Sequence, residues 1–221
     1  MAKKAKKNET AFVGVLLDES GSMSNARQDT IGGFNTFIDE LKKNNRNRSI
    51  HFNLVKFGGE KPLDRVYVGA KLENVAHLTE AGYKPHGNTP LIDAAVKMIK
   101  ALDEQRKKSG SGNVTLMLQT DGGENASVEY KRDDLKKLVE QKTEEGWQFI
   151  FVGADIDGYS DAVSYGFNIS NVASYSKSAT DAMFRTVGAN MSNYMATGNL
   201  TCSTFTNEQK AAMGENLVVK K

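Results

Sequence analysis

Three short runs made almost entirely of apolar residues constrain the fold of this chain most strongly. They lie at 11–17, 114–118 and 149–152. A strand with one face in water alternates apolar and polar residues, whereas a strand covered on both faces is apolar throughout. The three runs therefore predict central strands of a sheet that carries helices on both of its faces.

Weaker patterns complete the expected sheet. Residues 50–57 nearly alternate between apolar and polar, residues 66–68 form a short stretch between turn residues, and residues 169–172 form a weak last strand. We expect 66–68 to be an edge strand that runs antiparallel to its neighbour. Helical spacing of apolar residues recurs in the segments between the strands, at 31–41, 91–102, 135–139 and 184–195.

The alternation of strands and helices predicts an α/β fold. We expect a three-layer, Rossmann-like arrangement with a mainly parallel central sheet, one short antiparallel edge strand and helices on both faces. Residues 206–209 match a capping box and begin a short last helix, which Gly214 is placed to end.

The length of 221 residues suits one domain, and no Pro-, Gly- or Ser-rich linker divides the chain. We expect a single domain over 11–214, between a disordered basic tail at 1–10 and a disordered tail at 215–221. The basic tail either keeps the protein soluble or contacts phosphates and acidic surfaces. Its charge comes from Lys3, Lys4, Lys6 and Lys7.

Charge and cysteine content narrow the functional classes. The formal net charge is +2 with both signs interspersed, which favours neither nucleic acid nor an acidic partner for the domain as a whole. The single cysteine, Cys202, cannot form an intramolecular disulfide, and neither a signal peptide nor a long apolar stretch is visible. We therefore expect a cytoplasmic protein with no membrane association.

Oxygen-bearing side chains follow the first apolar run at alternate positions. Asp18, Ser20 and Ser22 point the same way on an extended segment, so they can converge on one small object beyond the end of the strand. Mg²⁺ accepts hydroxyls and water beside one or two carboxylates. Two later segments add oxygen side chains at element ends, since Thr89 opens a helical pattern and Asp121 follows the run at 114–118.

These five residues give the chain a resemblance to the von Willebrand factor A (VWA) family. In that family an Asp-x-Ser-x-Ser motif, a distant Thr and a distant Asp build the metal-ion-dependent adhesion site (MIDAS). The resemblance covers roughly residues 11–195, and the contexts Gly-x-Thr-Pro-Leu and Thr-Asp-Gly add specificity. It implies that the two aspartates act directly or through water, while the three hydroxyls complete the shell around Mg²⁺, with Mn²⁺ or Ca²⁺ as alternatives.

Helix capping is the other explanation for some of these residues. Ser22 or Ser24 is suited to cap a helix that begins near Asn25, because serine is a favoured N-cap. Thr89 is suited to an N-cap with Pro90 at the first helical position. A capping hydroxyl keeps lone pairs for a metal, so the two roles are compatible.

The resemblance implies a non-enzymatic module that binds a partner protein through an Asp or Glu on the metal. Asn25, His86, Asn88 and Glu124 lie on the loops around the expected ion, and we expect them to form a partner-binding rim. Stand-alone members in bacteria and phages are similar in length, which points to the cytoplasm of a bacterium or a phage-infected cell. An AAA+ ATPase or another operon partner is the class of partner that such relatives suggest.

Two alternatives remain open at this point. Asp155 and Asp157 follow a predicted strand and superficially resemble the paired aspartates of a metal-dependent phosphoesterase, although no second acidic pair follows them. The lysine arm suggests a nucleic-acid-associated protein. Phosphate-binding loops, zinc-ligand spacings and nucleophile elbows are absent from the sequence, so nucleotide hydrolysis, zinc chemistry and acyl transfer lack their usual signatures.

Overall fold

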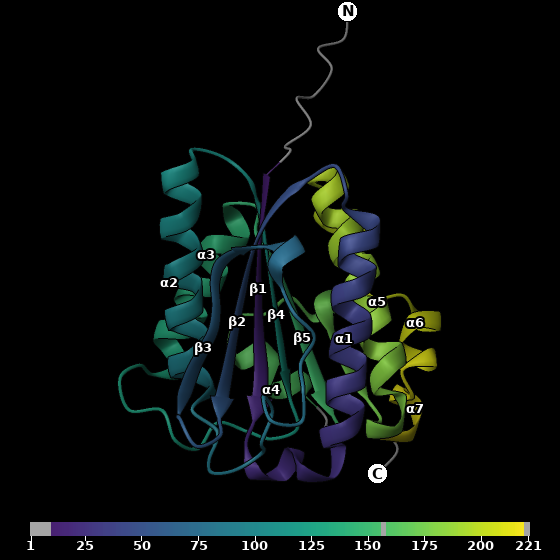
Figure 1. Ribbon diagram of the computed structural model, residues 1–221. Helices are drawn as coiled ribbons and strands as arrows, with labels where there is room; N and C mark the ends of the chain where they lie inside the picture. The colour runs from purple at the N-terminus through teal and green to yellow at the C-terminus, as the bar shows by residue number, and fades with distance from the viewer. Residues whose placement is uncertain (1–9, 156–157, 219–221) are drawn as a thin grey trace, which may run out of the picture.

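A six-stranded sheet forms the centre of the protein (Figure 1). The computed structural model describes residues 10–155 and 158–218. The strand order is β3-β2-β1-β4-β5-β6, and only β3 runs antiparallel to its neighbour. The strands are β1 (Thr10–Glu19), β2 (Ser49–Gly58), β3 (Leu63–Lys71), β4 (Asn113–Thr120), β5 (Gln148–Ala154) and β6 (Val172–Tyr175).

The strand order reverses at β1. Chain growth runs from β1 through β2 to β3 on one side, then returns to place β4 on the other side of β1. Loops that leave the carboxyl ends of β1 and β4 therefore diverge from one point, which is where open α/β sheets bind their ligands. The mainly parallel sheet with one antiparallel edge strand confirms the predicted fold class.

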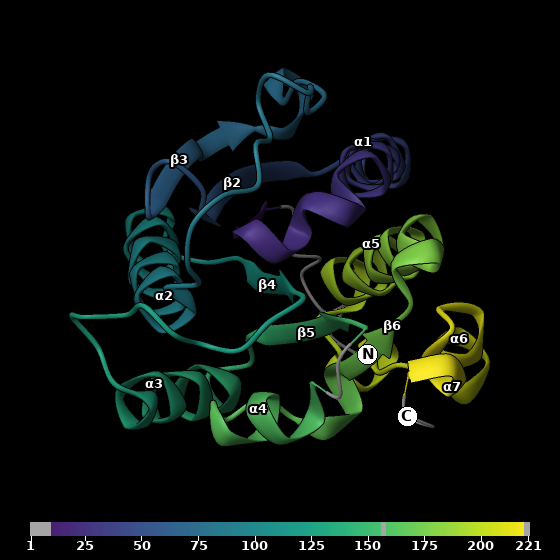
Figure 2. The same ribbon diagram turned by 90° about the horizontal axis from the view of Figure 1, so that it is seen from below.

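Helices cover both faces of the sheet, as Figure 2 shows from below. One layer contains α1 (Arg27–Asn44) and α5 (Thr180–Thr197). Helix α6 (Asn207–Ala212) contacts α5, and α7 (Glu215–Val218) contacts α6 and β6. The other layer contains α2 (Leu91–Ser109), α3 (Arg132–Glu144) and α4 (Tyr159–Ser164). Among the described helices, none has the length and apolar character that crossing a bilayer requires.

Two apolar clusters hold the three layers together. Val13, Val15 and Leu17 of β1 pack into the cluster with α1 and α5, while Phe12 and Leu16 pack with α2, α3 and α4. This alternation follows from the two-residue period of a strand. It explains why the first run of the sequence is apolar throughout.

The structure corrects two local expectations, the start of the last strand and the tail from residue 215, and confirms a third, the capping box. The last strand begins at Val172, because Ile169–Asn171 form a 3-10 turn that the Asn168 side chain caps. The tail predicted from residue 215 is wrong for Glu215–Val218, which form α7, and the Glu215 carboxylate accepts a hydrogen bond from Ser174 N at 2.9 Å. The capping box at the start of α6 is confirmed. The predicted N-terminal tail lies outside the described residues except for Thr10.

Candidate metal centre

Asp18 lies at the reversal point of the sheet, at the carboxyl end of β1, and is fully buried. Its Oδ1 accepts a hydrogen bond from Ser20 N at 2.8 Å, and its Oδ2 accepts one from Thr120 Oγ1 at 2.5 Å. Burial raises the pKa of Asp18 to about 6, although these hydrogen bonds favour the ionised form. A cation close to Asp18 would therefore stabilise the ionised form of its carboxyl group.

Ser20, Ser22 and Asp121 form a continuous chain of oxygen atoms. Ser20 Oγ lies 3.1 Å from Ser22 Oγ, and Ser22 Oγ donates to Asp121 Oδ1 at 2.5 Å. The last contact joins the loops after β1 and β4, which lie far apart in the sequence. Four of the five predicted ligands, Asp18 included, therefore meet at one edge of the sheet.

Thr89 reaches the same edge by a different route. Gly21 N donates to Gly87 O at 3.1 Å, which ties the segment before α2 to the loop after β1. Thr89 is buried, and its backbone pairs with Asn125. In the described part of the chain, no hydrogen bond joins the Thr89 hydroxyl to the other four predicted ligands.

Capping does not account for the hydroxyls of Ser22 and Thr89. The chain after Asp18 forms a 3-10 helix, Gly21–Ala26, which has no side-chain cap. Helix α2 begins at Leu91 with Pro90 in the N-cap position and also has no side-chain cap. The alternative role of Thr89 as an N-cap is therefore wrong, and Ser22 Oγ forms hydrogen bonds with Ser20 Oγ and Asp121 Oδ1 instead of capping a helix.

Lys177 also lies in this site, although no sequence motif marks it. Lys177 Nζ lies 2.8 Å from Asp121 Oδ2, and the Asp121 side chain is only 1% exposed. Lys177 follows β6, whose carboxyl end reaches the same edge of the parallel sheet. A basic residue just after the last parallel strand was the available signal.

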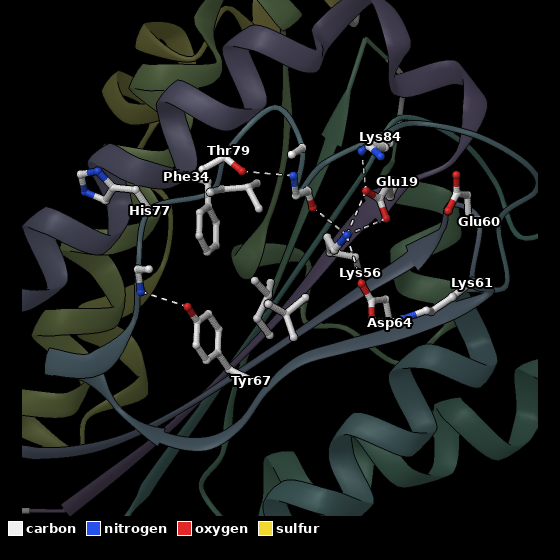
Figure 3. Close-up of a pocket in the computed structure, with 16 residues that line it drawn as sticks. Glu19, Phe34, Lys56, Glu60, Lys61, Asp64, Tyr67, His77, Thr79 and Lys84 are labelled. Carbon is white, nitrogen blue, oxygen red and sulfur yellow. Dashed lines mark hydrogen bonds and ion pairs between the residues drawn. The ribbon is translucent and has the colours of Figure 1, made fainter.

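Glu19 points away from Asp18, into a cavity of about 330 Å³ between α1, β2, β3 and the segment that leads to Thr89. Figure 3 shows Lys56 between Glu19 and Asp64, with Phe34 and Tyr67 among the apolar lining residues. Lys56 Nζ lies 3.0 Å from Glu19 Oε2 and 3.2 Å from Asp64 Oδ2.

Glu19 also fixes the approach of the Thr89 segment. Its Oε1 accepts a hydrogen bond from Lys84 N at 2.6 Å, and its carbonyl oxygen accepts one from His86 N at 2.8 Å. Lys56 Nζ donates to Gly82 O at 2.7 Å. The ion pair therefore anchors the segment that precedes Thr89 to the end of β1.

The four residues expected at a partner-binding rim divide into two groups. Asn25, His86 and Asn88 are exposed. The Glu124 carboxylate is instead used in internal hydrogen bonds, because Oε2 accepts from Ile92 N of α2 at 2.7 Å and Oε1 accepts from Ser127 N of its own loop at 2.7 Å. Its carboxylate holds the loop after β4 against the first turn of α2.

Asp155 follows β5 and has a positive φ of 52°, a conformation that few non-glycine residues adopt. Its Oδ1 accepts a hydrogen bond from Lys177 N at 3.1 Å, so this carboxylate fixes the loop after β6. Asp157, the other half of the suspected phosphoesterase pair, lies outside the described residues.

The assembled side chains fit a hard divalent cation. They offer only oxygen donors, which Mg²⁺ and Mn²⁺ accept, and Asp121 already attracts the ammonium group of Lys177 as a stand-in cation. Among the described residues, no cluster of three or more His, Cys, Asp or Glu side chains is placed to hold a metal. The candidate ligand set at this edge combines the two carboxylates with serine and threonine hydroxyls.

Comparison with known proteins identifies the family. The model of the von Willebrand factor type A domain matches residues 13–196, which is most of the chain, so the chain belongs to this family. VWA domains are adhesion or protein-interaction modules that are often metal-dependent. A search among curated protein sequences finds no match.

Solved structures with low sequence identity share the fold. Proximal thread matrix protein 1 of the mussel byssus is 17% identical with a TM-score of 0.54, over 82% of this chain and 48% of that protein. The manganese-loaded TRAP protein of Plasmodium vivax is 16% identical with a TM-score of 0.52, over 80% of this chain and 72% of that protein. The vWF domain of the type V pili tip protein Mfa5 from Porphyromonas gingivalis is 11% identical with a TM-score of 0.58, over 85% of this chain and 96% of that domain. This chain thus spans about half of the mussel protein.

Proposed function

We propose that this protein is a non-enzymatic interaction module that binds a partner through a divalent metal ion, with Mg²⁺ as the physiological ion. The proposed ligands are Asp18, Ser20, Ser22, Thr89 and Asp121. The observation that carries the proposal is the contact between Ser22 Oγ and Asp121 Oδ1, which joins the loops after β1 and β4 at the reversal point of the sheet. Family membership supports the same reading.

The charge of the site suits a bridging role. Two carboxylates and three neutral hydroxyls leave a divalent ion short of ligands, so a bound ion would supply an electrophilic position for an Asp or Glu of the partner. Asp18 and Asp121 provide the attraction for the cation, while Ser20, Ser22 and Thr89 orient it. We place the partner surface on the exposed residues Asn25, His86 and Asn88.

The proposed setting is the cytoplasm of a bacterium or a phage-infected cell. The proposed partner is a protein with an accessible acidic side chain, and an AAA+ ATPase or another operon partner is one such class. A nucleic-acid role would rest on Lys3, Lys4, Lys6 and Lys7, which lie outside the described residues. Binding that falls steeply with salt and disappears when residues 1–8 are deleted would support that role.

Catalysis is not part of this proposal. The Asp155 carboxylate accepts the backbone N–H of Lys177, which gives it a structural task in the loop after β6. We expect no turnover of generic phosphate esters by the wild-type protein with Mg²⁺. Turnover that disappears in Asp155→Asn would contradict this expectation.

Affinity capture with and without chelator tests the proposed function. Immobilised wild-type protein should retain a partner in Mg²⁺ and release it in EDTA, while Asp18→Ala should retain none in either buffer. Circular dichroism of Asp18→Ala should show an intact fold. Equal retention of the same partner by the wild type in Mg²⁺ and EDTA would contradict the metal bridge.

A further inference from the structure

Lys177 places a positive charge inside the proposed metal site. Its ammonium lies 2.8 Å from Asp121 Oδ2, and the side chains of Lys177 and Asp121 are 24% and 1% exposed. The other oxygen of Asp121 accepts the hydroxyl of Ser22. Both oxygens of this carboxylate are therefore paired without a metal ion.

The backbone around Lys177 is fixed by three contacts. Lys177 N donates to Asp155 Oδ1 at 3.1 Å, and Lys177 O accepts the hydroxyl of Thr180 at 2.6 Å. Asp155 N in turn donates to Tyr175 O at 2.8 Å, which ties the loop after β5 to the end of β6. Lys177 therefore extends towards Asp121 from a supported position between β6 and α5.

The ion pair with Lys177 stabilises the buried charge of Asp121 when no metal ion is bound. A carboxylate that is almost fully buried needs a charged or hydrogen-bonding partner, because an unpaired buried charge is strongly unfavourable. Lys177 supplies that partner for Asp121. A divalent cation at the same carboxylate would repel the ammonium group at short range. The metal ion and the Lys177 ammonium therefore cannot both contact Asp121 favourably.

We propose that Lys177 is a built-in competitor of the divalent ion for Asp121 and that it sets the metal affinity of the site. This inference rests on the proposed function. Metal loading requires the ammonium to leave Asp121 Oδ2, and part of the metal-binding free energy is used for that step. The protein therefore loads only when the divalent ion is abundant enough to displace its own lysine.

The test is a calorimetric titration of Mn²⁺ into the full chain in low-salt buffer. Lys177→Met removes the charge and keeps an unbranched side chain that is one atom shorter, Lys177→Arg keeps the charge, and Lys84→Met is the matched control. Lys84 is exposed at the same edge of the sheet and has no described contact with Asp18 or Asp121. Thermal unfolding in EDTA verifies that each variant is folded before titration.

We expect Lys177→Met to bind Mn²⁺ about fivefold more tightly than the wild type, as loss of a partly exposed ion pair suggests. Lys177→Arg and Lys84→Met should stay within about twofold of the wild type. Equal or weaker binding by Lys177→Met, with the wild type still binding, would overturn the competition and leave the proposed function intact.

Two other outcomes separate the inference from the function. Binding by Lys177→Met alone would support the competition and contradict metal-dependent function in the wild type. Absence of binding in the wild type and in every variant would overturn both.

Discussion

Gly58, the last residue of β2, lies directly against the backbone of Ser20 in the loop after β1. Gly58 has a φ of +103°, and a Cβ built on it would lie 2.5 Å from Ser20 N. No other residue type allows this approach without a shift of the backbone. The shape of the Asp18 loop therefore depends on a glycine in the neighbouring strand.

Gly58→Ala should disturb both stability and metal binding. We expect a loss of roughly 2–4 kcal/mol in the free energy of unfolding, because the new methyl group meets backbone atoms and φ becomes unfavourable. Mn²⁺ affinity should fall as Ser20 moves. Chemical denaturation and calorimetry measure the two effects.

Gly32 provides the control for that substitution. It lies in α1, and a Cβ built there meets nothing within 4 Å. Gly32→Ala should stabilise the protein by about 0.5–1 kcal/mol and leave Mn²⁺ affinity unchanged. Similar behaviour of the two alanine variants would show that the contact between Gly58 and Ser20 has no structural importance.

Lys56→Met should be strongly destabilising. The Lys56 and Glu19 side chains are 8% and 6% exposed, so the substitution leaves a buried carboxylate without its main partner. We expect a cost of about 3–5 kcal/mol. The double variant Glu19→Gln, Lys56→Met should recover part of it, since the unpaired charge is then removed.

Lys43→Met is the matched surface substitution. Lys43 is 68% exposed and its ion pair with Glu40 spans 3.9 Å, so we expect a change of less than about 0.5 kcal/mol. Urea denaturation compares the three variants. If Lys56→Met costs no more than Lys43→Met, the ion pair with Glu19 does not hold this part of the fold.

Asp103 of α2 should make stability depend on acid. Burial acts to raise its pKa, but hydrogen bonds from Lys107 and Lys142 outweigh burial and hold the pKa of Asp103 below its usual range. Lys142 belongs to α3 and lies 2.8 Å from Asp103, so the pair joins two helices. A lowered folded-state pKa stabilises the protein above the unfolded pKa, and the contribution is lost as the pH falls through the folded value.

Asp103→Asn should therefore destabilise the protein at neutral pH and have little effect once the pH is well below about 4. Melting temperatures of the wild type and the variant across this range measure the difference. Asp133→Asn is a suitable control, since Asp133 is exposed at the start of α3. A difference between wild type and Asp103→Asn that stays constant with pH would contradict the assigned ion pair.

The sequence was sufficient to predict the sheet and the meeting of its two central loops. Apolar runs mark strands covered on both faces, and parallel strands deliver their carboxyl ends to one edge. A hydrogen bond joins Ser22 of the loop after β1 to Asp121 of the loop after β4. Metal binding itself stays a prediction.

Other features depend on packing that local pattern does not encode. Glu124 turns inward because the N–H groups at the start of α2 need an acceptor, and the sequence does not reveal that α2 lies beside this loop. Lys177 reaches Asp121 from the loop after β6, whose backbone donates a hydrogen bond to the Asp155 carboxylate. Residues 215–218 form a helix whose Glu215 carboxylate accepts a hydrogen bond from Ser174 N of β6, a distant contact that the local sequence pattern does not show.

A crystal structure of the protein grown with Mn²⁺ tests the central claim most directly, through the anomalous scattering of the ion. We predict one strong peak at the carboxyl end of β1, about 2.1 Å from the hydroxyl oxygens of Ser20 and Ser22, with Asp18, Thr89 and Asp121 in direct or water-mediated contact. No peak at this edge, or a peak that Thr89 and Asp121 do not approach, would contradict the account.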